Sequence, residues 1–325
     1  MFANALKKLS RRSNFLENKA SETRLELKRK LDHFSSGAGT IEELQICLES
    51  GQPRTLQIFE KEVIVSMQKT KTSYFWRLSD PRTAIACLAV TGEYEVLETK
   101  ILKFFASNSE IIFDVGANVG YYAIELSTVL RPSAMIHAFE PIPESFDQLQ
   151  KNILLNSASS EVLCNQFAIS NSEGKLLLYK PRISGSSASS ARNLHPEESV
   201  DKVKVSMTTL DKYLLTNRLS NLDLLKIDVE GSELMVIEGA LESIKTYQPV
   251  IFAELLRKWC AQFGYSPNQV LEILFPIGYR CFAVSEKLPE IFSISEETQE
   301  TNFLFVPPKR IELIDRLYAE ADIRK

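Results

Sequence analysis

The stretch that decides the fold is FDVGANVGYY, Phe113–Tyr122, in which a hydrophobic run meets an acid and then two glycines. Ile111–Val115 has the composition of a buried strand, and an apolar pattern of helical period begins after Gly120. A strand that turns tightly into a helix places free backbone N–H groups and partial positive charge at the turn. The stretch therefore predicts a ligand site with room for an anionic group such as a pyrophosphate or a carboxylate.

The sequence that follows this stretch alternates between strand and helix patterns. The expected strands are IIFDV, AMIHAFE, EVLCNQFAIS, LDLLKIDVEG and PVIFAEL, with GKLLLY and VKVSM as added strands around a polar loop, Pro181–Ser199, and GYRCFAV and TNFLFV as closing strands. The expected helices are Asn118–Leu130, Pro143–Leu155, Ser232–Ile244 and Ser266–Leu274. This alternation predicts an α/β fold with a doubly wound, mostly parallel sheet and helices on both faces.

The N-terminal part of the chain differs in charge from the rest. Residues 1–34 contain nine Lys and Arg against four Asp and Glu, whereas the whole chain of 325 residues has a net charge of −4. A length of this order allows one large core plus an appendage. The expected organisation is a basic helical arm at 1–40, a cap segment with helices and a hairpin at 41–105, a main domain at 106–310, and a C-terminal helix or tail at 311–325.

Composition excludes several classes of protein. The acidic balance argues against general nucleic-acid binding. The five cysteines are odd in number, and without a CxxC pair they indicate neither a zinc site nor a disulfide framework, so a reducing cytoplasm is expected. No stretch resembles a signal peptide or reaches the ~18 apolar residues of a membrane span. Weak contact of residues 1–34 with a membrane surface, or pairing of two chains through this arm, stays open.

Two nucleoside cofactors compete for the glycine loop. A dinucleotide site is typically marked by the motif GxGxxG, whereas this loop has Gly116, Asn118 and Gly120 at every second position. In addition, the carboxylate of Asp114 would repel a pyrophosphate. S-adenosylmethionine carries an ammonium, a carboxylate and a sulfonium. Its positive groups can bind the acid, and its carboxylate can bind the helix N-terminus. Glu140 ends the next strand, in AFEPIP, where its carboxylate can accept hydrogen bonds from two ribose hydroxyls. The loop favours S-adenosylmethionine, and a packing turn with incidental acids is the alternative.

Acids also end the later strands of the expected sheet. Asp228 follows an apolar run and Glu254 ends PVIFAEL, with Glu230 two residues beyond Asp228. Carboxylates that lie close together raise the pKa of one of them, which makes a better base. Glu230 could instead be an acid that stabilises a helix N-terminus, and His195 in the polar loop is either a base, a sugar contact or simply solvated. Asp228 and Glu254 would accept Mg²⁺, but we expect no metal.

Several stretches together resemble the FkbM family of S-adenosylmethionine-dependent methyltransferases. They are TGEYEVLETKIL, FDVGANVGYYAIELS, AFEPIPESFDQLQKNILLN, LLKIDVEGSELMVIEGA, PVIFAEL and NFLFVPP, which run in order from Thr91 to Pro308. KIDVEGSE followed by PVIFAE is the specific part. The resemblance implies a class I methyltransferase domain at 106–310, with a Rossmann-like, seven-stranded type of sheet, that methylates a hydroxyl on a glycan or small natural product. A protein or peptide methyltransferase, or a dinucleotide-dependent oxidoreductase, is the alternative.

The resemblance implies cofactor roles for the glycine loop, Glu140 and the stretch Ala168–Ser170, and it places Asp228 and Glu230 where they face the methyl donor. Glu95, Glu254 and His195 are candidates from their own positions in the sequence and not from the resemblance. The expected cofactor-binding residues are Glu95, Asp114, Gly116, Asn118, Gly120, Glu140, Pro141, Ala168, Ile169 and Ser170, the last three flanking the adenine. The expected catalytic residues are Asp228, Glu254, Glu230 and His195.

Overall fold

The computed structural model describes residues 54–59, 62–77, 84–182 and 188–320. The chain divides into two compact units, one of residues 1–69 and 76–94 and the other of residues 70–75 and 95–325. The expected basic arm at 1–40, and with it the expected membrane contact and dimer contact, lies outside the described residues.

The first unit contains the expected hairpin. Strands β1 (Arg54–Phe59) and β2 (Glu62–Met67) are antiparallel, with Arg54 opposite Met67 at one end and Phe59 opposite Glu62 at the other. Alternate side chains of β2 are buried, as expected for a strand with one face against a core. The unit also holds helix α3 (Ala84–Thr91), and strand β3 (Ser73–Arg77) crosses the boundary between the two units.

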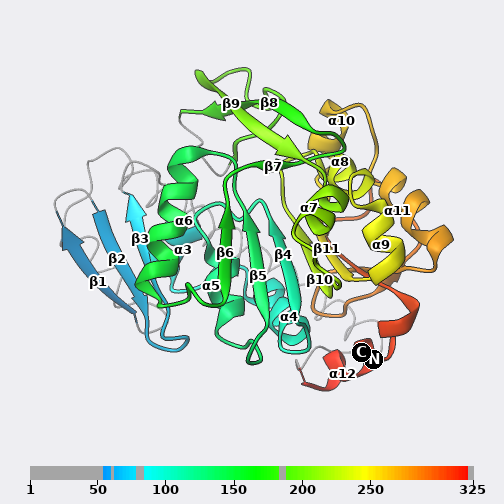
Figure 1. Ribbon diagram of the computed structural model, residues 1–325, viewed down its shortest axis with the longest axis horizontal. Coiled ribbons are helices and arrows are strands. Elements are labelled where there is room, and N and C mark those ends of the chain that lie inside the picture. Colours follow the sequence, from blue (N-terminus) through cyan, green and yellow to red (C-terminus); the bar gives the residue numbers. More distant parts are fainter. Residues whose placement is uncertain (1–53, 60–61, 78–83, 183–187, 321–325) are drawn as a thin grey trace, which may run out of the picture. The chain divides into compact units, whose positions relative to one another are not determined.

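A large sheet forms the centre of the second unit (Figure 1). In its described part the order of strands is β13-β12-β14-β11-β10-β4-β5-β6, with β6, β5, β4, β10 and β11 parallel and β14 antiparallel to β11. Their bounds are β4 (Ile111–Val115), β5 (Met135–Phe139), β6 (Val162–Asn165), β10 (Leu224–Ile227), β11 (Val250–Glu254), β12 (Arg280–Ala283), β13 (Glu290–Ile291) and β14 (Asn302–Val306). The doubly wound, mostly parallel fold is confirmed. The short β13 makes eight described strands where a seven-stranded type was expected.

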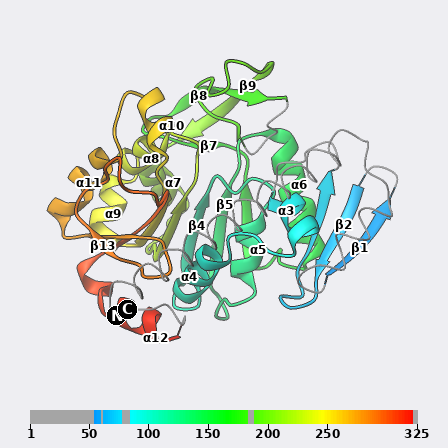
Figure 2. The same ribbon diagram turned by 180° about the vertical axis from the view of Figure 1, so that it is seen from behind.

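The strand order reverses beside β4, which is the position where open α/β sheets bind ligands. After β4 the chain continues to β5 and β6 on one side, and it returns to β10 on the other side. Helices cover both faces of the sheet (Figures 1 and 2). They are α4 (Val96–Ala106), α5 (Tyr121–Ser127), α6 (Pro143–Leu155), α7 (Leu210–Thr216), α8 (Glu233–Glu238), α9 (Leu241–Tyr247), α10 (Arg257–Gln262), α11 (Asn268–Leu274) and α12 (Glu312–Glu320).

The single helix expected at Ser232–Ile244 is wrong, because the chain forms α8 and α9 with a break at Gly239. A Cβ at Gly239 would lie 2.0 Å from the carbonyl oxygen of Ser170, so the backbone of another segment occupies that side. Asp211 gives the second helix a new start, since its Oδ1 accepts a hydrogen bond of 2.8 Å from the N–H of Ser243. Close packing and this cap together end one helix and begin the next.

The strand expected over EVLCNQFAIS is also divided. Its first part is β6 of the large sheet, but β7 (Ala168–Ile169) pairs with β9 (Val200–Thr208), which is antiparallel to β8 (Gly174–Pro181). The added strands are thus confirmed as a separate small sheet. This sheet lies beyond the carboxyl ends of β4, β5 and β6 (Figures 1 and 2), so it stands over the end of the sheet where the site is expected.

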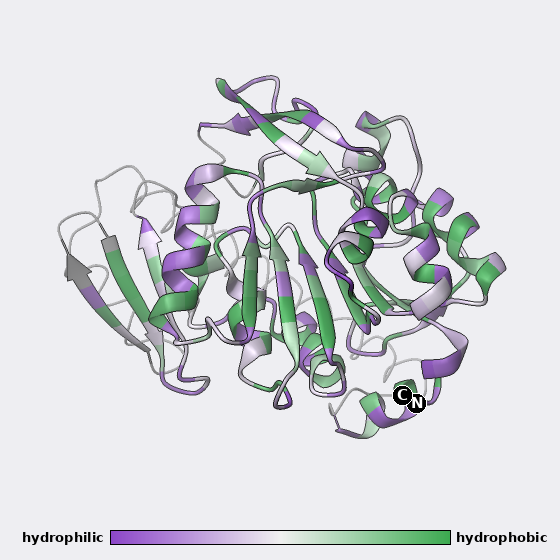
Figure 3. Ribbon diagram, in the orientation of Figure 1, coloured by the Kyte–Doolittle hydropathy of each residue, from purple (hydrophilic) through white to green (hydrophobic). Residues whose placement is uncertain are grey.

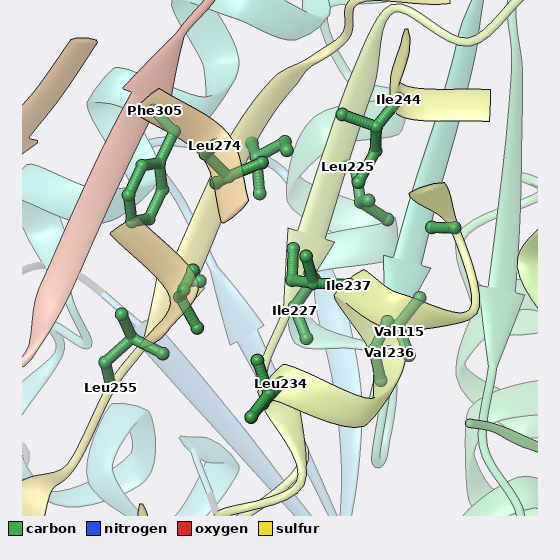
Figure 4. Packing of buried hydrophobic residues seen from close by; sticks show 14 of the residues in the cluster. Val115, Leu225, Ile227, Leu234, Val236, Ile237, Ile244, Leu255, Leu274 and Phe305 are labelled. Atoms are coloured by element: carbon green, nitrogen blue, oxygen red, sulfur yellow. The ribbon is translucent and has the colours of Figure 1, made fainter. Parts of the chain in front are cut away.

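The core lies between the large sheet and its helices. Figure 3 shows the central strands mostly in the hydrophobic colour, and Figure 4 shows side chains of β4, β10, α8 and α9 packed together. Every residue of β10 is buried, as expected for a strand covered on both faces. Truncating one large core side chain such as Ile227 to alanine typically costs about 2–5 kcal/mol. The strand ends are therefore held on a rigid base.

Candidate active site

The glycine loop after β4 packs against two neighbouring strands. The N–H groups of Gly116 and Ala117 both donate to the carbonyl oxygen of Phe139 at the end of β5, at 3.0 and 2.9 Å. Gly116 has a φ of +81°, and a Cβ there would lie 1.8 Å from the carbonyl oxygen of Asp228, just after β10. Only glycine fits this position, because both the backbone angle and the space exclude a side chain.

The same loop presents one hydrogen-bond acceptor without a partner. The Oδ1 atom of Asn118 is buried, and no described residue donates a hydrogen bond to it. A buried acceptor left unsatisfied costs about 1–3 kcal/mol, so this atom is suited to a donor on a ligand. The next glycine, Gly120, precedes α5, and a Cβ there would lie 2.6 Å from Cδ1 of Leu149. The loop therefore combines a close backbone approach with a vacant acceptor.

Glu140 lies at the end of β5, beside this loop. Its Oε2 accepts a hydrogen bond from the N–H of Asn118 (2.9 Å), and its Oε1 accepts one from the N–H of Ile142 (2.8 Å). Burial raises the pKa of Glu140 to about 7, although these two hydrogen bonds act to lower it. Both carboxylate oxygens are thus fixed in direction, and each keeps a lone pair for a further donor.

The segment Ala168–Ser170, which is expected to flank the adenine, lies near the glycine loop and Glu140. Pro141 is partly buried and directly follows Glu140. Ala168 is buried in one cluster with Ile142, whose N–H binds Glu140. Ile169 belongs to the main core, and the N–H of Ser170 donates to the carbonyl oxygen of Thr208 at 2.9 Å, which fixes the end of β7.

A buried ammonium joins the glycine loop to the end of β10. Lys226 Nζ lies 3.2 Å from Oδ1 of Asp114, 3.3 Å from Oδ2 of Asp228 and 3.3 Å from the carbonyl oxygen of Gly116. It also lies 5.0 Å from the centre of the Tyr122 ring, within cation–π range. Burial acts to lower the pKa of Lys226, but the charges of Asp114 and Asp228 raise it overall, so the group is a cation.

Three of the expected catalytic residues meet at the strand ends. Asp228, Glu230 and Glu254 each bring a carboxylate oxygen within 4.8 Å of the other two. Burial, with the charge of Asp228 next, raises the pKa of Glu230 to about 8 and that of Glu254 to about 10. This acid cluster, Asp228–Glu230–Glu254, therefore retains a proton at neutral pH. Its oxygens are also of the type that binds hard cations.

A fourth acid, Glu233, braces the turn that carries this cluster. Its Oε1 accepts hydrogen bonds from the N–H groups of Val229 (3.2 Å) and Gly231 (3.0 Å), and its Oε2 accepts one from the hydroxyl of Tyr265 (3.1 Å). Burial raises the pKa of Glu233 to about 7. This role of Glu233 was not predicted from the sequence, although an acid in the first turn of an expected helix is a signal for it.

His195 lies outside the acid cluster but is connected to it through Trp259. The rings of His195 and Trp259 contact each other with centroids 5.4 Å apart, and Trp259 lies beside Glu230, whose pKa it acts to lower. The hydroxyl of Ser190 donates to the carbonyl oxygen of Glu230 at 2.7 Å. The polar loop thus packs on the acid-bearing turn. Trp259 was not predicted as a site residue, since only packing brings it there.

Glu95 lies on the acid-cluster side rather than with Glu140. It caps α4 with a φ of 41°, and the hydroxyl of Tyr122 donates a hydrogen bond to its carboxylate. Its negative charge contributes to the raised pKa values of Glu254 and Lys226. Its surroundings therefore fit the end of the ligand site that faces the acids.

The site lies within a stretch that matches a known family. The model of the methyltransferase FkbM domain matches residues 114–281, just over half of the chain. No helix in the described part of the chain is long and apolar enough to cross a membrane.

Curated relatives are methyltransferases by name. Methyltransferase sdnD of Sordaria araneosa is 35% identical over 161 residues, which cover 42% of this chain and 62% of that protein. Hexuronic acid methyltransferase AglP of Haloferax volcanii is 27% identical over 199 residues, 61% of this chain and 71% of that protein. 31-O-demethyl-FK506 methyltransferase FkbM of Streptomyces tacrolimicus is 26% identical over 161 residues, 40% of this chain and 59% of that protein. The match to the first of these spans about three fifths of its length.

Proposed function

The chain belongs to the FkbM methyltransferase family, and on this premise we propose that it is an S-adenosylmethionine-dependent O-methyltransferase. The proposed acceptor is a hydroxyl on a glycan or a small natural product. We assign the methyltransferase domain to residues 106–310 and the site of action to the cytoplasm. The cysteines Cys87, Cys164, Cys260 and Cys281, which form no disulfide within the described residues, fit a reducing compartment.

The glycine loop, Gly116–Gly120, and Glu140 together form what we call the glycine-loop corner. Its residues fit the cofactor. Glu140, with both oxygens oriented by backbone N–H groups, is suited to accept hydrogen bonds from two ribose hydroxyls. The vacant Oδ1 of Asn118 is suited to accept a hydrogen bond from the ammonium of the amino-acid part. Gly116 lets the loop pack directly against the carbonyl oxygen of Asp228, because it has no side chain. When bound, S-adenosylmethionine supplies an electrophilic methyl group on a sulfonium.

The acid cluster carries the proposal for the reaction type. An alcohol acceptor must lose a proton when its oxygen bonds to the methyl carbon, and a positioned base assists that loss by roughly 10²–10⁴-fold. Glu230 and Glu254 have pKa values raised to about 8 and about 10, so their ionised forms are stronger bases than an ordinary carboxylate. We assign the base to the cluster as a unit, because its members share protons.

The residues around the acid cluster are proposed to bind the acceptor. Trp259 and His195 offer ring surfaces next to Glu230, and rings of this kind bind the apolar faces of sugars. Ser190 ties the polar loop to the same turn. We propose that His195 contacts the acceptor, and that alignment of the acceptor oxygen with the bond between sulfur and methyl contributes several kcal/mol.

The experiment that tests this function uses S-adenosylmethionine with a ¹³C-labelled methyl group. The purified protein is incubated with three separate acceptor pools: uronic-acid glycosides, neutral glycosides, and peptides. Uronic acids come first because one relative is named a hexuronic acid methyltransferase. The proposal expects a ¹³C-methyl ether on a glycoside hydroxyl, identified by NMR, and none with the Glu140→Ala variant. Label on peptide side chains alone would contradict it and favour a peptide methyltransferase.

A further inference from the structure

We propose that Lys226 is a positioning residue that holds the glycine loop and Asp228 in place on the two sides of the cofactor pocket. The inference rests on the proposed function. It adds a residue that was not among the expected site residues, and it assigns that residue a role behind the site rather than in contact with the ligand. Lys226 is 3% exposed, so it meets the ligand only through the groups that it holds.

The protein itself surrounds the Lys226 ammonium with oxygens. Nζ donates hydrogen bonds to Oδ2 of Asp228 and to the carbonyl oxygen of Gly116, both at 3.3 Å. It also forms an ion pair with Asp114, whose Oδ1 lies 3.2 Å away. These oxygens come from β4, from the end of β10 and from the glycine loop. One side chain therefore joins the three segments that carry the proposed cofactor site.

The sheet register explains why these groups meet. Lys226 on β10 lies directly opposite Asp114 on β4 in the parallel pair. Asp228 is two residues further along the chain, and residues two apart in a strand point to the same side. Gly116 follows the end of β4, and its backbone carbonyl oxygen accepts a hydrogen bond from the ammonium. The register of β4 and β10 thus places Lys226 beside Asp114, and the turns after the two strands bring Gly116 and Asp228 to the same ammonium.

Charge makes the arrangement rigid. The side chain of Asp114 is 0% exposed and that of Lys226 4%, whereas that of Asp228 is 36% exposed and reaches the site. Glu95, whose carboxylate accepts from Tyr122, adds a fourth charge near the ammonium. A buried charge that loses its partner is strongly unfavourable. Lys226 therefore restrains Asp228 and Gly116 more firmly than a surface lysine would.

The test measures binding of S-adenosylhomocysteine by calorimetry, together with thermal unfolding, for wild type and three variants. Lys226→Met removes the charge and all three donors at similar length. Lys226→Arg keeps the charge but cannot place its planar donors on the same three oxygens. Lys103→Met is the matched control, because Lys103 pairs with the buried Glu125 away from the site. Glu125 keeps the hydroxyls of Thr72 and Tyr74 as donors in that control.

The expected result is at least a 10-fold weaker affinity for S-adenosylhomocysteine in Lys226→Met, a smaller loss in Lys226→Arg, and no change in Lys103→Met. A merely structural lysine would lower the unfolding temperature in both methionine variants and leave the affinity unchanged in both, which would overturn the inference. If Lys226→Met does not fold, wild-type affinity in folded Lys226→Arg overturns it instead. Wild-type protein that fails to bind S-adenosylhomocysteine would overturn the proposed function itself.

Discussion

The glycine-loop corner and the acid cluster lie at the same end of one sheet, but their polar groups are satisfied in different ways. In the corner, the oxygens of Glu140 are matched by backbone N–H groups, with lone pairs left for a ligand. In the cluster, Asp228, Glu230 and Glu254 face one another within 4.8 Å. Hydrogen bonds to N–H groups favour the ionised form of an acid, whereas neighbouring negative charges disfavour it.

This difference suits the glycine-loop corner to ligand recognition and the acid cluster to proton transfer. A carboxylate that is fixed by the backbone suits recognition, because its direction does not change when a ligand arrives. Burial and then neighbouring negative charges raise the pKa of Glu230 to about 8 and that of Glu254 to about 10, so the ionised forms of these carboxylates are stronger bases that suit proton transfer. Lys226 lies between the regions and contacts Asp114 and Gly116 on one side and Asp228 on the other.

The largest effect is expected from Gly116→Ala, which would break the corner itself. The new Cβ would lie 1.8 Å from the carbonyl oxygen of Asp228 at a φ of +81°. We expect a loss of at least about 2 kcal/mol in the free energy of unfolding and no measurable binding of S-adenosylhomocysteine. Gly264→Ala is the matched control, since Gly264 has the same φ of +81° and nothing within 4 Å of its Cβ position. Equal losses in the two variants would contradict the close packing.

Asp228→Asn tests the cluster without disturbing the corner. We expect turnover to fall by roughly 10²-fold or more, while the affinity for S-adenosylhomocysteine stays within about 3-fold. The charge of Asp228 raises the pKa values of Glu230 and Glu254, so its removal lowers them. The rise of residual turnover with pH should therefore shift to lower pH. Wild-type turnover with an unchanged pH profile would remove Asp228 from the mechanism.

Glu140→Ala tests the corner without disturbing the cluster. The loss of two hydrogen bonds to a charged group, about 1.5 kcal/mol each, should weaken binding of S-adenosylhomocysteine by about 100-fold. The fold should stay intact by circular dichroism. Glu144→Ala is the control, because Glu144 lies on α6 with its side chain 56% exposed. Undiminished binding in Glu140→Ala would exclude the ribose contact.

The pH dependence of cofactor binding gives a finer test of the same carboxylate. The pKa of Glu140 is raised to about 7, and acceptance of two hydroxyl donors requires the ionised form. Affinity for S-adenosylhomocysteine should therefore decline as the pH falls through about 7, where Glu140 is half ionised, and approach its full value about one pH unit higher. Titrations between about pH 5.5 and 8.5 measure this change, and Glu140→Gln should flatten it. A decline that persists in Glu140→Gln would assign it to another group.

The smallest effect is expected from His195→Ala. The ring contacts Trp259 and lies 3.5 Å from the carboxylate of Glu197, outside the acid cluster. Loss of an acceptor contact should raise KM and lower turnover by less than about 10-fold. A general base would instead be worth roughly 10²–10⁴-fold. Steady-state kinetics with the acceptor found in the labelling experiment decides between the two, and a 100-fold fall in turnover would move His195 into the mechanism.

Local patterns predicted much of the frame. The strand Ile111–Val115 and the helix Pro143–Leu155 have the bounds that were expected, because hydrophobic period and proline position are properties of neighbouring residues. The FkbM family and its cofactor class were also predicted from the sequence, and the family match is confirmed over residues 114–281. The roles of the individual site residues stay predictions.

Contacts between distant segments were not predictable in the same way. Gly239 interrupts an expected helix because Ser170, far away in the sequence, packs against it. Lys226 meets the carbonyl of Gly116 across 110 positions of sequence, and Trp259 meets His195 only once the polar loop is packed. Such features depend on strand order and on the path of loops, which the pattern of one segment does not contain.

We propose that the glycine loop and Glu140 bind S-adenosylmethionine rather than a dinucleotide. Calorimetric titration of the purified protein with S-adenosylhomocysteine, with NAD as the comparator, tests it most directly. We predict micromolar binding of S-adenosylhomocysteine, absence of NAD binding, and about 100-fold weaker binding of S-adenosylhomocysteine in Glu140→Ala. Binding of NAD alone would contradict the account and place a dinucleotide in the loop.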